Sequence, residues 1–238
     1  MAGRPMTRGA VREPAATLHS SAARPEPPER VRDAERSRTA ILAAAERLFA
    51  ERGYEGTSLS DIGSAAGLSR GTPSYFFGSK AKLYSDVLTG VFGGRQEAVT
   101  RAFAGVNAWC DGDGSIELLR DPLVRAANGY MRYLEENPTF VALVMREELD
   151  GGKRLHQATS SSTAMHDAFS AVHKVGRRRG IRSFRVEEAV LLFTVLTFGP
   201  YSLRRTLMPR VGIDLTTDAG RRRQARLVAD QMLHLISA

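Results

Sequence analysis

The side chains whose types and spacing could do chemistry lie together between residues 70 and 80, in the segment RGTPSYFFGSK. Arg70 carries a guanidinium fork that can bind a guanine edge or a phosphate. Hydroxyl groups suited to phosphate or base edges follow at Thr72 and Ser74. Pro73 offers apolar surface to a thymine methyl group, and Tyr75 offers a long reach with a polar tip. This set is suited to contacting DNA, with sequence discrimination coming from Arg70 to Tyr75.

These side chains need a helix to hold them, and the residues before them predict two short helices across a tight turn. Ser58 can cap the first helix, and Asp61 three residues later completes a capping box. Ile62 begins an apolar face at helical spacing. Gly67 stands where a left-handed helix end favours glycine. Short helix, glycine turn, short helix is the arrangement of a helix-turn-helix, whose second helix enters the major groove.

The second helix is expected to start late. Ser69 or Thr72 can cap it, and Pro73 is favourable as its first residue but not in its interior. Phe76 and Phe77 are assigned to the hydrophobic core.

A longer helix precedes the motif and is expected to begin at Asp33 or Ala34 and to stop at Gly53. One apolar stripe runs along it at helical spacing. This stripe should pack on the motif and serve as its scaffold. The stripe consists of Ile41, Leu42, Ala45, Leu48 and Phe49, and its expected partners are Ile62, Leu68 and Phe77.

With AILAAAERLFAERGYEGTS before the motif and FFGSKAKLY after it, residues 36–86 resemble the DNA-binding domain of the TetR (tetracycline repressor) family of transcriptional regulators. The resemblance implies an all-α fold. It implies an N-terminal three-helix helix-turn-helix DNA-binding domain, residues 34–85. A helical-bundle domain for ligand binding and dimerisation follows, residues 86–238. Residues 1–33 are expected to form a disordered basic arm.

The resemblance also assigns a role to Lys80. The family segment usually reads G-T-L-Y-x-x-F-x-x-K, and Gly71, Thr72, Phe77 and Lys80 match it by position. Lys80 therefore corresponds to the family's phosphate-binding lysine, with Ser79 as the cap of the helix that follows. Proline replaces the usual leucine and serine the usual tyrosine. The family's tyrosine-to-phosphate contact is therefore not transferred to this sequence.

Charge and composition agree with a nucleic-acid partner. The 238-residue chain has a net charge of +8, which favours a polyanion, and a single cysteine, Cys110. No apolar run is long enough for a transmembrane helix, and no signal-peptide core is present, so a cytoplasmic location is expected. The arm is either a tail without a defined role or a strand that reaches phosphates or a minor groove. Its arginines are Arg4, Arg8, Arg12, Arg24, Arg30 and Arg32.

The second half of the chain is predicted to be helical throughout. Helices are expected from about Ser79 through Val91, over 115–137, over 138–149, and as one element over 153–179. The arginines at 177–179 and 221–223 are assigned to solvated helix faces. The last two helices are expected to form a four-helix dimer interface. They are 186–203, with a kink or an interruption at Gly199 and Pro200, and 219–236. A monomeric core is the alternative. The expected interface residues are Leu192, Val195, Leu196, Leu227, Val228 and Leu233.

The helices after residue 86 carry many large, adaptable apolar side chains. Met and aromatic residues at helical spacing are usually plain core, but the resemblance independently implies a pocket among these helices. We expect an apolar or amphipathic small-molecule effector there. The candidate lining residues are Trp109, Tyr130, Met131, Phe140, Met145, Met165, Phe169 and Phe193.

Motifs for catalysis are absent from the sequence, which has no phosphate-binding loop, dinucleotide fingerprint or nucleophile elbow. The five histidines lack the spacing of a zinc site, so we expect no metal and no cofactor. The leading hypothesis is a homodimeric transcriptional regulator, not an enzyme. It would be a repressor released from a pseudo-palindromic operator by its effector. The alternatives are a DNA-binding dimer that acts through a protein partner without an effector, and an all-α enzyme with a vestigial helix-turn-helix.

Overall fold

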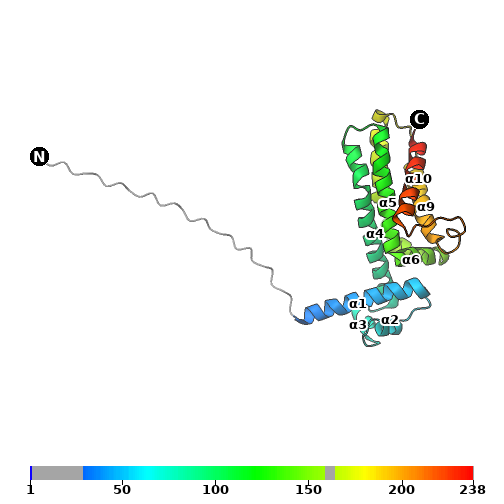
Figure 1. Ribbon diagram of the computed structural model, residues 1–238. Helices are drawn as coiled ribbons and strands as arrows, with labels where there is room; N and C mark the ends of the chain where they lie inside the picture. Colours follow the sequence, from blue (N-terminus) through cyan, green and yellow to red (C-terminus); the bar gives the residue numbers. More distant parts are fainter. Residues whose placement is uncertain (2–28, 159–163, 238) are drawn as a thin grey trace.

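The chain forms a helical base below a taller helical body, as seen in a computed structural model that describes residues 1, 29–158 and 164–237 (Figure 1). The base contains α1 (Glu29–Arg52), α2 (Leu59–Ala65) and α3 (Thr72–Phe77). The long helix α4 (Lys80–Asp111) begins in the base and continues into the body without a break. A single rigid element therefore joins the two parts.

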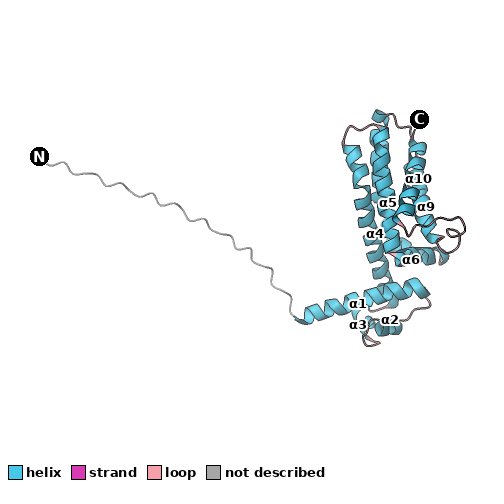
Figure 2. Ribbon diagram, viewed as in Figure 1, coloured by secondary structure: helices cyan, strands magenta, loops and turns pink. Residues whose placement is uncertain are grey.

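The body is built from α4 and the helices that follow it. In it, α5 packs against both α4 and α10, and α8 packs against α4 and α9. Figure 2 shows helices in both parts of the molecule, which confirms the expected all-α fold. The body elements are η1 (Ile116–Leu119), α5 (Arg120–Glu136), α6 (Pro138–Leu149), α7 (Lys153–Ala158), α8 (Ala164–Gly176), η2 (Arg177–Arg179), α9 (Val186–Ser202) and α10 (Asp218–Ile236).

The first helix starts earlier than the sequence indicated, at Glu29 instead of Asp33 or Ala34. An acidic residue in the first turn stabilises the positive end of the helix dipole. Two of the arm's arginines, Arg30 and Arg32, therefore belong to α1. The other four lie outside the described residues, as does most of the predicted arm.

The base has its own hydrophobic core, and the predicted stripe of α1 lies in it. Ile41, Leu48 and Phe49 are buried together with Ile62 of α2 and Phe77 of α3, as predicted. The end of α1 is closed by a buried threonine: Thr57 Oγ1 donates to the carbonyl oxygens of Leu48 at 3.2 Å and Gly53 at 2.9 Å.

The body differs from the predicted pattern in one place. The single helix expected over 153–179 is wrong: α7 packs on α4 and α6, whereas α8 packs on α4 and α9. Five consecutive serine and threonine residues, 159–163, separate the two helices in the sequence. α9 continues through Gly199 and Pro200 to Ser202, so the helix is not interrupted there.

Two arginines assigned to solvated faces instead bind backbone carbonyl groups, Arg179 at the C-terminus of α4 and Arg221 in the loop before α10. Arg179 donates to the carbonyl oxygens of Trp109 (2.5 Å), Cys110 (3.1 Å) and Gly112, at the C-terminus of α4. Arg221 is buried and donates to Leu215 O and Thr216 O, at 2.9 and 2.8 Å. A guanidinium carries five donors, enough to satisfy several carbonyl groups at once.

None of the helices within the described ranges is long and apolar enough to cross a bilayer.

Candidate nucleic-acid interface

The turn between α2 and α3 has the local geometry that the sequence predicted. Ser58 Oγ accepts a hydrogen bond from Asp61 N, and Asp61 Oδ2 accepts one from Ser58 N, both at 3.1 Å. This is the predicted capping box. The Ser58 hydroxyl also donates to Asp61 Oδ2 at 2.6 Å, and this bond, followed by the bond from Ser58 N, lowers the pKa of Asp61. Gly67 has a φ of +70°, as its position required. Gly63 is equally constrained, since a Cβ there would lie 2.7 Å from the carbonyl oxygen of Ser69.

The start of α3 corrects two expectations. Its N-cap is Gly71, and neither Ser69 nor Thr72 caps it; their hydroxyl oxygens instead lie 2.7 Å apart in a hydrogen bond. Pro73 is the second helical residue, where a missing N–H costs nothing. Its ring is buried. The thymine contact expected of Pro73 is therefore wrong, because the ring packs on the α2–α3 turn near Gly63.

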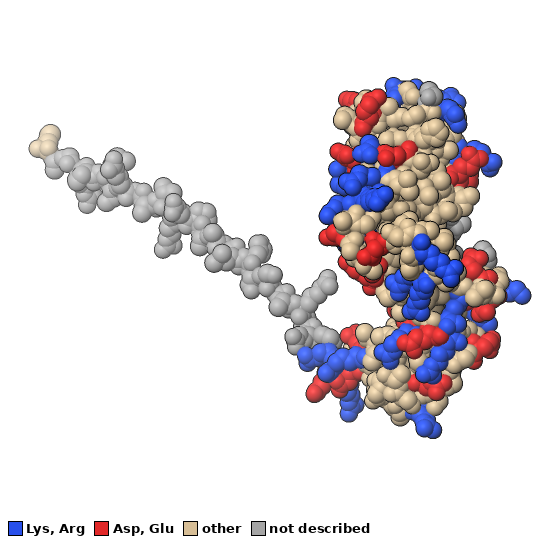
Figure 3. Space-filling view, turned by 45° about the vertical axis from the view of Figure 1, so that its right-hand side comes forward, with Lys and Arg blue, Asp and Glu red and all other residues tan. Residues whose placement is uncertain are grey.

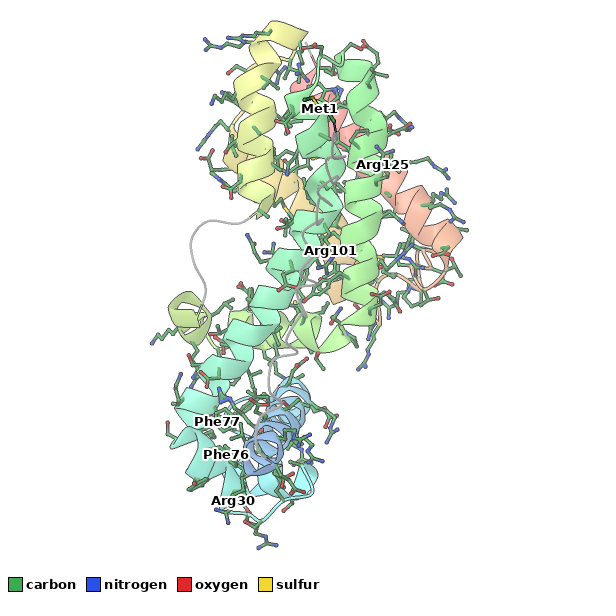
Figure 4. The ribbon with its side chains drawn as sticks, turned by 90° about the vertical axis from the view of Figure 1, so that its left-hand side faces the viewer. Met1, Arg30, Phe76, Phe77, Arg101 and Arg125 are labelled. Carbon is green, nitrogen blue, oxygen red and sulfur yellow. The ribbon has the colours of Figure 1, made fainter. Side chains whose placement is uncertain are left out.

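The remaining side chains of α3 divide between an outer and an inner face. Tyr75 is 85% exposed, and Arg70 and Ser74 are exposed beside it. Phe77 is buried and Phe76 half-buried, which confirms their assignment to the core (Figure 4). The hydroxyl of Ser74 and the phenol of Tyr75 on α3 are thus exposed, together with the guanidinium of Arg70 in the turn before α3.

Lys80 lies in a more confined place than its assigned role suggests. Its Nζ donates to the carbonyl oxygen of Tyr54 at 2.9 Å and lies 4.2 Å from the centre of the Tyr54 ring. Ser79 caps α4 as predicted, by accepting from Lys82 N at 3.1 Å. An ammonium group has three donors, so the bond to Tyr54 leaves two for other acceptors. The phosphate contact stays a prediction.

Charges of both signs are interspersed over the base in the view of Figure 3. Lys82 and Arg38 share one carboxylate, that of Asp86, at 2.5 and 3.4 Å. Arg38 also covers the ring of Phe77, 4.7 Å from its centre. The positive charge available to a phosphate backbone is therefore smaller than the count of basic residues indicates.

Contacts from the body hold the base in position, and the sequence analysis missed all of them. Arg146 of α6 donates to the carbonyl oxygens of Ala50, at 2.7 Å, and Glu51, and so closes the end of α1. Arg154 of α7 pairs with Glu55 at 3.3 Å and lies 4.1 Å from the centre of the ring of Tyr54. These residues lie about a hundred positions apart, so no local spacing could have indicated the contacts.

The contacts between the body and the base around Tyr54 form a junction, which also contains a buried carboxylate. Glu147 is fully buried and accepts from Tyr84 Oη at 2.7 Å and from Leu155 N at 3.0 Å. Burial, and then the bond to Glu147, raise the pKa of Tyr84 far above its ordinary value. The Tyr84 phenol therefore stays a donor. α4, α6 and α7 are joined at this point, one helical turn from Lys80.

The eight residues predicted to line an effector pocket are mostly core. Seven are buried, and only Met145 is exposed, at 37%. Phe103, Phe169 and Phe193 form an aromatic cluster, with ring centres 5.0 to 5.9 Å apart. The Trp109 indole donates to Ser115 O at 3.0 Å.

Two clefts at the surface of the body each include one of the eight predicted residues, and other residues form the rest of their lining. A cleft of about 230 Å³ between α1, α4 and the α5–α6 turn includes Phe140. A cleft of about 760 Å³ between α1, α6 and the end of α9 includes Met145. Neither is lined by the other six candidates.

Some of the residues predicted to form the dimer interface are exposed, and others are buried in the core of the body. Val195 and Leu227 are 54% and 47% exposed, whereas Leu192, Leu196 and Leu233 are half-buried against the core. Val228 is fully buried, so its assignment to an interface is wrong. It packs in the body core, whereas the adjacent Leu227 is exposed. Leu191, one turn before Val195 and 63% exposed, was missed.

A capped helix, a glycine turn and a second helix with an exposed polar face define a helix-turn-helix DNA-binding regulator. Residues 41–87 match the family described as "Bacterial regulatory proteins, tetR family", and residues 120–232 match "Tetracyclin repressor-like, C-terminal domain". The chain belongs to the TetR family. It is a DNA-binding transcriptional regulator.

Several relatives are similar along most of the chain. The transcriptional repressor NicS of Pseudomonas putida is 25% identical over 193 residues, 78% of this chain and 85% of the relative. The repressor BepR of Brucella suis is 27% identical over 153 residues, 62% of this chain and 69% of the relative. A TetR-family regulator structure from Mesorhizobium loti superposes with a TM-score of 0.61 at 18% identity, over 86% of this chain and 98% of the other. The last likeness supports the fold.

Proposed function

We propose that the protein is a homodimeric repressor that binds a pseudo-palindromic operator through a pair of α3 helices. The observation on which this rests is the exposed surface at α3: Ser74 and Tyr75 of the helix and Arg70 of the preceding turn are exposed, while Phe77 anchors the helix in the base. Lys80 would add a phosphate contact, and Thr72 a hydroxyl. The similarity to NicS and BepR, both described as repressors, supports repression over activation. Such a regulator would act in the cytoplasm.

Dimerisation would use the outward faces of α9 and α10. Leu191 and Val195 lie one turn apart on α9, and Leu227 is exposed on α10. Large apolar side chains exposed in this way are typical of surfaces that become buried on association. Half-sites one turn apart place the two recognition helices about 34–36 Å from each other. Leu227→Glu should give monomers with poor operator binding, and sedimentation showing an unaltered dimer would place the interface elsewhere.

The release of the repressor by a small apolar or amphipathic effector remains part of the proposal. Its support is the junction, because Arg146, Glu147 and Arg154 connect the body to the base around Tyr54 and Lys80. A ligand that displaced α6 or α7 would alter those contacts and so the separation of the two α3 helices. The packed aromatic cluster would have to open to admit it.

That packing favours a second candidate, a DNA-binding dimer that acts through a protein partner without an effector. Selection of bound DNA from a random pool with the purified protein tests the common part of both proposals. A two-fold symmetric consensus is expected, and recovery of unrelated sequences would contradict it. A screen of small molecules against the selected operator then separates the candidates, since loss of binding is expected only of the effector-released repressor.

A further inference from the structure

A cleft of about 430 Å³ lies between α4 and α5, away from α3 and from the exposed apolar residues of α9 and α10. Its floor is made of residues without long side chains. Gly129 of α5 lies so close to α4 that a Cβ on it would be 3.2 Å from the Cβ of Ala102. The depression therefore follows from the sequence, because the floor side chains end at or before Cβ. The floor residues are Ala98, Ala102, Gly105 and Gly129.

Three arginines surround this floor: Arg101 from α4, and Arg125 and Arg132 from α5. Figure 4 shows Arg101 and Arg125 on these two neighbouring helices. Arg125 extends across the floor, with Nη2 3.5 Å from the position that a Cβ on Gly105 would occupy. The guanidinium thus lies over the opposite helix.

The charge of these arginines is only partly balanced: Arg132 contributes, after Arg221 and Arg222, to lowering the pKa of Asp218. Arg101 has only a long contact with Glu97, 3.7 Å, and both side chains are largely exposed. Arg125 and Arg132 form no ion pair with the carboxylates of the described residues. Among the residues that line the cleft, Glu136 is the single acid against three arginines.

We propose that this cleft binds a small organic anion carrying at least two acidic groups, carboxylates or phosphates. A guanidinium fork matches either group in a two-bond geometry. Arg125 and Arg132 lie seven residues apart, about 10 Å along the helix, so a ligand with separated charges can contact both. The slim floor accepts the body of the ligand, and the volume falls in the range of small-molecule sites.

The proposal does not depend on the effector, and DNA binding can be measured separately in the same samples. The experiment is calorimetric titration of the full-length protein with citrate, with pyrophosphate and with acetate at constant ionic strength. Saturable binding of citrate or pyrophosphate at one site per chain is expected, with acetate much weaker. Citrate alone would identify a carboxylate site and pyrophosphate alone a phosphate site; binding of both supports the shared chemistry. No saturable binding of either would overturn the proposal.

Two variants locate the binding in the cleft. The double substitution Arg125→Gln/Arg132→Gln removes exposed side chains and should weaken binding at least about tenfold, since charged hydrogen bonds are lost. The control Arg177→Gln/Arg178→Gln removes the same charge from exposed positions on η2 and should change affinity less than about twofold. Gly105→Leu keeps the charge and fills the floor, and should also weaken binding. Equal weakening in both double variants would show a general charge effect and contradict the site.

Discussion

α3 and the aromatic cluster of the body both contain several aromatic residues, yet they use them oppositely. In α3, Tyr75 is 85% exposed while its neighbour Phe77 is buried. In the body, Phe103, Phe169 and Phe193 are all buried and touch one another. A short helix covered on one side only must expose part of its surface, whereas helices surrounded by others bury nearly all of it. An aromatic residue is therefore available for binding in α3 but serves as hydrophobic core in the body.

The two regions also differ in how their polar groups are satisfied. In the α2–α3 turn the partners are close in sequence, as in the Ser58–Asp61 capping box. At the junction the partners are remote: Glu147 bonds Tyr84, 63 positions away. The local bonds of the α2–α3 turn shape the surface around α3 through residues of one short segment. Remote bonds make the position of that surface depend on the body.

The largest effect should come from Phe193→Ala. If this ring is core, its removal leaves a cavity and lowers the free energy of unfolding by about 3–5 kcal/mol. Urea unfolding followed by circular dichroism measures the loss. Leu191→Ala, two residues away and exposed in the isolated chain, is the matched control and should change stability by less than about 1 kcal/mol. A small loss at Phe193 would mean that the cluster is looser than the packing indicates.

Glu147→Gln should lower the free energy of unfolding by about 2 kcal/mol, because the amide cannot accept from both Tyr84 Oη and Leu155 N as the carboxylate does. The neighbouring exposed residue supplies the control, Glu148→Gln, with an expected change within about 0.5 kcal/mol. Thermal and urea unfolding of the three proteins test this. Equal stability of both variants would remove Glu147 from the junction.

Arg70→Ala and Tyr75→Ala should each cost about 1–3 kcal/mol of binding free energy on the selected operator, for each base contact that is lost. The cost on scrambled DNA should be smaller, since base contacts alone carry sequence information. Fluorescence anisotropy at fixed salt provides both numbers. Equal losses on the two DNAs would take these side chains off the reading surface.

The smallest effect is expected from Lys80→Ala, roughly 1 kcal/mol and similar on operator and scrambled DNA. The slope of the logarithm of affinity against the logarithm of salt concentration should become shallower by the amount that one phosphate contact contributes. Lys82→Ala, also on the first turn of α4 but paired with Asp86, is the comparison variant. An unchanged slope for Lys80→Ala would show that this lysine serves only to hold Tyr54.

Much of the fold was predictable because its signals act over a few residues. Ser58, Asp61 and Gly67 mark the turn by capping and by left-handed geometry, and Pro138 starts α6 where it was expected. Apolar spacing identified the stripe of α1. Each of these signals works through bonds or sterics within one or two helical turns, so the order of the amino acids alone determines them.

Tertiary structure decided which candidate residues are available for function. It buried Pro73 and Val228, and placed Lys80 on Tyr54. It also turned Arg179 and Arg221 from surface charges into groups that bind backbone carbonyl oxygens. Exposure depends on what other segments cover, and those segments come from distant parts of the chain. The sequence alone determined where the recognition helix lies; the packing of base and body determined which of its side chains face outward and what holds them there.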